Sequence, residues 1–265
     1  KQIKKNTILS GNYDGLYILE KENSNWILKN KLDGFSNSSR YFVFADKNKI
    51  FVNHEYKGVF KLNVDQQFKN ITKVVKDTIL DKGIHSSLIR YKDKILYASK
   101  KGVYTYDDSK DSFKKDSIFS QLISEDVFLS AKLIHDKVKD KLWSFAKGEI
   151  RYLTPGKFSN IPDLEIIPLN ESLFKGASGF ENILHLKDQE YLIGTTRGYL
   201  VIDLNLIKDP LDFYISINKV LNNQTDATQL PVDFSRSQEF NSTNNSFQFF
   251  YSVPNYNKGS IVKYS

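Results

Sequence analysis

The sequence predicts an all-β protein whose main part repeats one four-stranded antiparallel sheet around an axis, which is the architecture of a β-propeller. Three observations support this prediction. A glycine-centred turn returns at nearly constant spacing, the strand after each turn alternates apolar residues, and further short strands precede each turn. The chain has 265 residues, of which 40% are hydrophobic and 14% aromatic, so it can bury a sizeable core.

The turn glycines set the period of the repeat. They are spaced 43, 44, 46 and 50 residues apart, and they are Gly15, Gly58, Gly102, Gly148 and Gly198. The second and fourth residues after each glycine are apolar or aromatic, whereas the third varies, so we expect one face of this strand to be buried. These ten positions are Tyr17, Leu19, Phe60, Leu62, Tyr104, Tyr106, Ile150, Tyr152, Leu200 and Ile202.

The remaining strands of each unit are predicted on either side of this turn. A short apolar run precedes each glycine, at residues 7–9, 49–52, 94–98, 141–145 and 190–194. An earlier run, absent from the first unit, covers 40–48, 87–94, 131–140 and 182–189. Outer strands are predicted within 25–30, 68–75, 112–119 and 164–169. We therefore predict five four-stranded blades belonging to a larger ring, in preference to an unrelated β-sandwich, with helical turns allowed within 65–82 and 117–128.

From residue 208 the pattern changes, and a second domain is predicted. Residues 208–265 lack the glycine unit and contain two strong strand candidates, 213–220 and 246–253. The domains are therefore predicted as a propeller over 1–207 and the start of an Ig-like β-sandwich over 208–265. The segment 206–212, with Pro210, forms a short connection, which we expect to make the two domains move together.

Composition argues against several functions. The net charge is +7, but arginines are few and lysines are spread along the chain, which favours a solvated surface over direct contact with nucleic acid. Without cysteine the chain has no disulfide and no thiolate site. No run reaches the roughly 18 apolar residues that a membrane helix needs, so we expect any membrane anchor outside this segment.

Catalytic motifs are also missing from the sequence. It contains no G-x-S-x-G, no H-E-x-x-H and no P-loop, so we expect no catalytic residue, no enzymatic activity of this segment and no cofactor. His135 and His185 fall at the same place in neighbouring units. Two such histidines are too few for a metal site, and we interpret them as polar residues lining the propeller channel.

A ligand site is predicted where loops converge on one face of the propeller. The loops that enter each blade and the turns between its second and third strands lie on the same face, so the loops 34–40, 81–87 and 174–181 should meet these turns. The candidate ligand-binding residues are Tyr13, Arg40, His54, Tyr56, His85, Lys100, Ser178, Glu181 and Arg197.

The blade sequence "GTTRGYLVID" and the tail "NNSFQFFYSVPNYNKGSIVKYS" carry a family resemblance. They resemble the regulator-propeller repeats of Bacteroidetes-type sensor proteins and the three-tyrosine, Ig-like domain that follows them in hybrid two-component sensors and LuxR-type membrane regulators. The positions that match the tail pattern are Asn245, Phe247, Tyr251, Tyr256 and Tyr264. The match to the tail is partial, and such propellers usually have about seven blades.

The resemblance implies a non-catalytic, periplasmic portion of an inner-membrane protein. Its propeller would bind a small molecule, an oligosaccharide or a protein partner and relay the event through the sandwich to a histidine kinase or a helix-turn-helix domain, with a homodimer as one signalling arrangement. The alternative is a secreted or surface propeller enzyme or lectin that acts on glycans.

Overall fold

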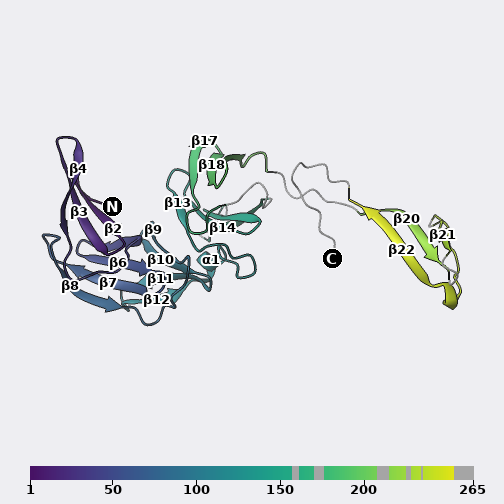
Figure 1. Cartoon of the computed structure of the whole chain (residues 1–265), viewed down its shortest axis with the longest axis horizontal. Coiled ribbons are helices and arrows are strands. Elements are labelled where there is room, and N and C mark those ends of the chain that lie inside the picture. Colours follow the sequence, from purple (N-terminus) through teal and green to yellow (C-terminus); the bar gives the residue numbers. More distant parts are fainter. Residues whose placement is uncertain (157–160, 170–175, 208–214, 225–227, 234, 254–265) are drawn as a thin grey trace. The chain divides into compact units, whose positions relative to one another are not determined.

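The computed structural model describes residues 1–156, 161–169, 176–207, 215–224, 228–233 and 235–253 (Figure 1). The chain divides into two compact units, Lys1–Leu204 and Asn205–Ser265. The predicted boundary between residues 207 and 208 stays a prediction, because 208–214 lie outside the described residues. Within the described part of the chain, no helix is both long enough and apolar enough to cross a membrane.

The first unit is a β-propeller built from antiparallel sheets whose strands follow one another in chain order. Blade 1 consists of β1 (Gln2–Lys4), β2 (Thr7–Asn12), β3 (Gly15–Glu22) and β4 (Asn25–Lys31). Blade 2 consists of β5 (Tyr41–Asp46), β6 (Lys49–His54), β7 (Gly58–Val64) and β8 (Ile71–Lys76). The sequence prediction missed β1, because three residues with a single half-buried apolar side chain, Ile3, give no periodic signal.

Three further sheets complete this unit. Blade 3 contains β9 (Ser87–Tyr91), β10 (Lys94–Ser99), β11 (Gly102–Asp107) and β12 (Ser112–Lys115). Blade 4 contains β13 (Ile134–Asp136), β14 (Lys141–Ala146), β15 (Glu149–Thr154) and β16 (Asp163–Pro168). Blade 5 has three strands among the described residues, β17 (Ile183–Lys187), β18 (Glu190–Thr195) and β19 (Gly198–Asp203), rather than the four predicted.

Only one of the two predicted helical turns is found. Helix α1 (Ser117–Ser120) follows β12, and the Asp116 side chain caps it by accepting from the backbone N–H groups of Ile118 and Phe119. The other stretch, 65–82, instead forms β8, whose β-branched residues pair with β7.

The hydrophobic core is divided into clusters, each shared by two consecutive blades. One cluster joins Leu16 and Ile18 of blade 1 to Phe60 and Leu62 of blade 2. The opposite face of blade 2 joins a second cluster with blade 3, and similar clusters join blade 3 to blade 4 and blade 4 to blade 5. An inner blade therefore packs both faces of its sheet, as in other radial repeat proteins.

This packing corrects the expectation that only the second and fourth residues after each glycine are buried. In blade 1 the third residue, Ile18, is buried, whereas Tyr17 and Leu19 are half-buried. In blade 2 both Val59 and Phe60 are buried. The reason is that a blade with neighbours on both sides buries alternate residues against each of them.

The glycine alignment is also wrong by one residue in blade 4. Ser99 pairs with Gly102 in blade 3, whereas Ala146 pairs with Glu149 in blade 4, so Glu149 and not Gly148 is the equivalent position. Gly148 lies inside the turn with φ of 75°. Because a shift of one residue exchanges the two faces of a strand, Ile150 packs towards blade 5 and not towards blade 3.

The second unit contains one three-stranded antiparallel sheet in the order β21-β20-β22. Strand β20 (Ser216–Asn223) pairs with β21 (Gln229–Pro231) and β22 (Ser246–Ser252), and the short 3₁₀ helix η1 (Ser242–Asn244) precedes β22. The two predicted strands are thus present with slightly different ends. Tyr256 and Tyr264 of the tail pattern lie outside the described residues, and the Ig-like sandwich stays a prediction.

Candidate functional site

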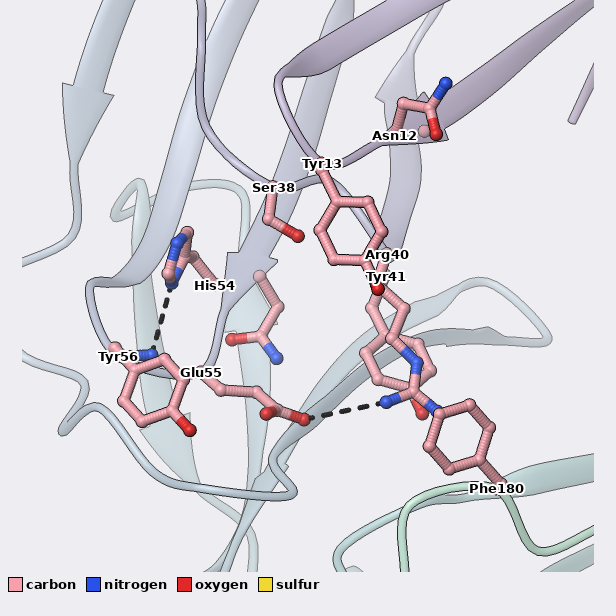
Figure 2. Close-up of a pocket in the computed structure, with 11 residues that line it drawn as sticks. Asn12, Tyr13, Ser38, Arg40, Tyr41, His54, Glu55, Tyr56 and Phe180 are labelled. Carbon is pink, nitrogen blue, oxygen red and sulfur yellow. Dashed lines mark hydrogen bonds and ion pairs between the residues drawn. The ribbon is translucent and has the colours of Figure 1, made fainter.

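A pocket of about 570 Å³ opens where loops of several blades meet (Figure 2). The turn between β2 and β3, the loop between β4 and β5, the turn between β6 and β7 and the loop before β17 all contribute to it. These are the loop classes that the propeller topology brings to one face. The lining residues are Gly11, Asn12, Tyr13, Ser38, Arg40, Tyr41, Asn53, His54, Glu55, Tyr56 and Phe180.

The two turns present aromatic side chains at the mouth of the pocket. Gly15 has φ of 142°, which allows the tight turn that leaves Tyr13 91% exposed. In blade 2 His54 pairs directly with Gly58, so this turn has one more residue than its counterparts and carries Tyr56 outwards, 64% exposed. Exposed aromatic rings beside a pocket provide flat apolar surfaces on which a ligand can stack.

Arg40 lines the pocket beside the rings of Tyr41 and Phe180 (Figure 2). Its guanidinium carbon is 3.9 Å from the centre of the Phe180 ring and 5.0 Å from that of Tyr41, distances that allow cation–π attraction. The guanidinium donates to the carbonyl of Gly179, and the Tyr41 hydroxyl donates to the same oxygen at 2.9 Å. Arg40 therefore joins blade 2 to the loop before blade 5.

Glu55 faces Arg40 without a close hydrogen bond. Its Oε1 atom is 4.0 Å from Nη1 of Arg40, and this oxygen is enclosed and accepts no hydrogen bond from a described residue. A buried carboxylate oxygen without a donor is unfavourable. A ligand hydroxyl or N–H group in the pocket would supply the missing donor.

Two further groups have pKa values shifted by their surroundings. Burial, and then the charge of Lys57, lower the pKa of His54, so its imidazole is neutral at pH 7. His54 Nδ1 accepts a hydrogen bond from the Tyr56 backbone N–H at 3.2 Å, which leaves Nε2 as the protonated nitrogen. Burial raises the pKa of Tyr41, which remains a hydroxyl donor.

Glu181 fixes the loop that carries Phe180. This residue is 1% exposed, and its carboxylate accepts from the Gly179 backbone N–H and from the Ser130 hydroxyl, both at 2.9 Å. Lys132 donates to the Glu181 carbonyl. Glu181 therefore acts as a support for the loop and does not line the pocket.

The structure brings together four of the nine candidate residues, namely Tyr13, Arg40, His54 and Tyr56. His85 lies beneath the loop, and a side chain at Gly179 would meet its Nδ1 atom at 3.2 Å. Lys100, Ser178 and Arg197 do not line the pocket, and the first and last of these are exposed in their own turns. Ligand binding by the four residues stays a prediction.

Several lining residues were missed from the sequence. Phe180 lies in the predicted loop 174–181, of which residues 174 and 175 are outside the described residues. An aromatic residue in this glycine-rich loop could have been predicted from the sequence as a ligand contact. Tyr41, Asn53 and Glu55 carried no such signal, because each belongs to an ordinary strand or turn. Among the residues that the structure describes, no three metal-ligating side chains gather.

The fold of this chain is shared by a solved structure. No family model and no curated protein sequence matches the chain. A solved extracellular domain assigned to a hybrid two-component system of B. thetaiotaomicron aligns with 96% of this chain, at a TM-score of 0.62 and 13% identity. The chain spans 34% of that domain.

Other solved structures align less well. The extracellular domain assigned to a one-component system of B. thetaiotaomicron has a TM-score of 0.43, with 12% identity over 84% of this chain and 37% of its own. The WD40 β-propeller domain of Doa1 also scores 0.43, with 12% identity over 94% of this chain and 80% of its own. The first likeness, at a TM-score of 0.62, shows that this chain shares its fold with part of that extracellular domain.

Proposed function

We propose that this chain is the extracytoplasmic sensor part of a membrane-bound signalling protein or transcriptional regulator, and that it carries out no reaction itself. The single observation that carries the proposal is the pocket around Arg40, which combines exposed aromatic rings with unused hydrogen-bonding capacity. The fold shared with the extracellular domain assigned to a hybrid two-component system supports the same interpretation.

The chemistry of the pocket favours a polar ligand with hydroxyl groups, such as an oligosaccharide. Arg40 offers guanidinium N–H donors, and Glu55 offers an enclosed oxygen that needs a donor. A sugar hydroxyl can donate to Glu55 while a neighbouring one accepts from Arg40. Tyr13 and Tyr56 would then stack on the apolar faces of the sugar rings.

The proposal is tested by screening the purified chain against neutral and charged oligosaccharides and following its thermal midpoint. A ligand at about 100 times its dissociation constant adds roughly 2.7 kcal/mol to the free energy of unfolding. We expect Glu55→Gln and Tyr56→Ala each to weaken binding about tenfold, since a charge-assisted hydrogen bond or an aromatic contact contributes about 1 to 3 kcal/mol.

Tyr199→Ala is the matched control, because Tyr199 is another largely exposed tyrosine, at 73%, in blade 5 and outside the pocket. Equal losses in Tyr56→Ala and Tyr199→Ala would contradict the assigned pocket. Hydrolysis of the oligosaccharide by the wild-type chain would contradict the non-catalytic role and favour a glycan-degrading enzyme.

Relay through the second unit is a separate part of the proposal. The connection 206–212 is short and contains Pro210, which limits independent motion of what it joins. A flexible Gly/Ser insertion after Asp209 in the membrane-bound protein should leave ligand affinity unchanged and abolish the output. Unchanged output after the insertion would exclude a mechanical relay.

A further inference from the structure

A second cavity, of about 690 Å³, lies among the first strands of the blades. It is lined by residues of β5, β9 and β13, by residues that flank β9 and β13, by Lys1, and by Asn182, which directly precedes β17. The first strands of propeller blades surround the central channel. This cavity is therefore distinct from the pocket around Arg40, with which it shares no lining residue.

The lining of this channel cavity carries charge of one sign. Its charged side chains are Lys1, Arg90, Lys92, Lys132 and Lys137, and among its described lining residues there is no aspartate or glutamate. Lys92 is neutralised by an ion pair with Asp140 at 2.7 Å, and the same carboxylate approaches His135 at 3.4 Å. Among the described residues, no ion pair is found for the other four cations.

Arg90 and Lys132 direct their donors to neutral groups. Arg90 donates through Nη2 to the carbonyls of Phe44 and Ala45, each at 3.1 Å. Lys132 donates to the carbonyl of Glu181, whose carboxylate is occupied by other donors. Burial lowers the pKa of Lys132 in spite of the nearby Glu181 charge. An anion in the cavity would offset this cost of burial.

Two further polar side chains of the cavity, Lys137 and Asn182, can donate hydrogen bonds. Lys137 forms no ion pair with any described residue. The side-chain oxygen of Asn182 accepts from the Ile183 backbone N–H at 3.1 Å, which leaves its NH₂ group as a donor. A cavity that offers donors and positive charge is complementary to a ligand that only accepts hydrogen bonds.

We propose that this channel cavity binds a compact multivalent oxyanion of the diphosphate type, either free or as the phosphate group of a small organic molecule. Arg90, Lys132 and Lys137 supply the charge, and Asn182 supplies an additional donor. Several cations around one volume favour a multivalent anion over chloride, because each added negative charge gains Coulomb attraction to the same cations. The site goes beyond the proposed function and does not depend on the pocket around Arg40.

Calorimetric titration of the whole chain with sodium pyrophosphate in 150 mM NaCl tests the proposal. That salt concentration screens attraction to scattered surface charges over distances beyond about 8 Å. We expect saturable binding, and no binding of neutral glucose at this site. Glucose 1-phosphate distinguishes the two sources: tighter binding than pyrophosphate identifies an organic phosphate, and weaker binding identifies a free oxyanion.

Charge-removing variants locate the site. Lys132→Gln and Lys137→Gln should each weaken pyrophosphate binding about tenfold, which is about 1.4 kcal/mol. Lys147→Gln is the control, because it removes the same charge from an exposed turn outside the cavity and should leave the affinity unchanged. Lys137 is itself exposed, so its variant tests the site without disturbing the core.

Two outcomes would overturn the proposal: no saturable binding to the wild-type chain, or an equal loss in Lys147→Gln and in the cavity variants. The test is independent of the proposed sensor pocket. Tyr56→Ala should leave pyrophosphate binding intact, so failure of the oligosaccharide proposal and failure of this one can be told apart.

Discussion

Blades 2 and 5 are built from the same strand pattern, yet their third strands are buried to different extents. In β7 the residues Val59 and Leu62 are fully buried, on opposite faces of the strand. In β19 the equivalent of Val59 is Tyr199, which is 73% exposed, and Val201 on the same face is 46% exposed. The comparison shows that burial in this fold is decided by the neighbouring blades and not by the hydrophobicity of the strand.

The two blades also differ in charge on that face. Lys61 in β7 occupies the position of Val201 in β19, and Lys61 is buried beside Asp77, with Nζ and Oδ2 3.3 Å apart. Asp77 also accepts from the backbone N–H groups of Ile79 and Leu80, both at 3.0 Å. The buried face of blade 2 thus carries an ion pair, whereas the exposed face of blade 5 carries the apolar residue Val201 at the same position.

The largest effect is expected from breaking this buried pair. Asp77→Ala removes the buried counter-ion of Lys61 and two hydrogen bonds to backbone N–H groups, and it leaves Lys61 with the exposed Asp111 carboxylate at 3.6 Å. The free energy of unfolding should therefore fall by about 3 kcal/mol. Urea denaturation measures it. The double variant K61M/D77L should recover part of the loss, because it removes both charges. A single variant as stable as the wild type would contradict a buried pair.

The next effect compares two turn glycines with similar backbone angles. Gly15 and Gly198 have φ of 142° and 140°. A Cβ at Gly15 would lie 2.6 Å from the Phe35 carbonyl oxygen, whereas at Gly198 it meets nothing within 4 Å. Both alanine variants incur backbone strain, and Gly15→Ala should lose about 1 to 3 kcal/mol more through overpacking. Equal thermal midpoints of the two variants would show that the chain around the Phe35 carbonyl moves away from the added methyl group without loss of stability.

A matched pair of valines isolates burial itself. Val59→Ala should lower the free energy of unfolding by about 2 kcal/mol, because two buried methyl groups are removed and a cavity remains. Val201→Ala on the corresponding face of blade 5 should change it by less than about 0.5 kcal/mol. Denaturation of both variants provides the measurement. A comparable loss for Val201→Ala would mean that its face is covered in solution.

The smallest effect concerns acid stability at the junction of blades 2 and 3. Hydrogen bonds from Lys49 and Tyr106 lower the pKa of Asp111 from 3.8 to about 2. This contribution is present above pH 4 and is lost as the pH falls towards 2, because the carboxylate is protonated first in the unfolded chain. It is small because the Asp111 side chain is 62% exposed. Asp111→Asn should reduce the slope of the thermal midpoint against pH in this range.

Asp188→Asn, in the turn between β17 and β18 of blade 5, is the control for this experiment. It removes a carboxylate for which no ion pair is found among the described residues. Its slope should equal that of the wild type. If both variants lost the same slope, the acid dependence would be a general charge effect and not a property of the Asp111 cluster.

Much of the candidate site followed from the sequence and the topology together. The period of the turns placed Tyr13 and Tyr56 on one propeller face, and the entering loop added Arg40. The sequence did not separate these from Lys100 and Arg197, which lie in the equivalent turns of blades 3 and 5 and do not line the pocket. Repeat position fixes the face on which a turn lies, but not which turns share a cavity.

The sequence by itself determined the all-β repeat, the approximate strands and the change of pattern near the second unit, because each depends on local alternation and turn chemistry. Only the tertiary structure decided that the inner blades bury both faces, that the alignment shifts by one residue at Gly148, and that Arg40 contacts Gly179 across 139 residues of chain. The physical reason is that these features depend on which blade lies against which. Contact between blades is set by distances in space that no local pattern encodes.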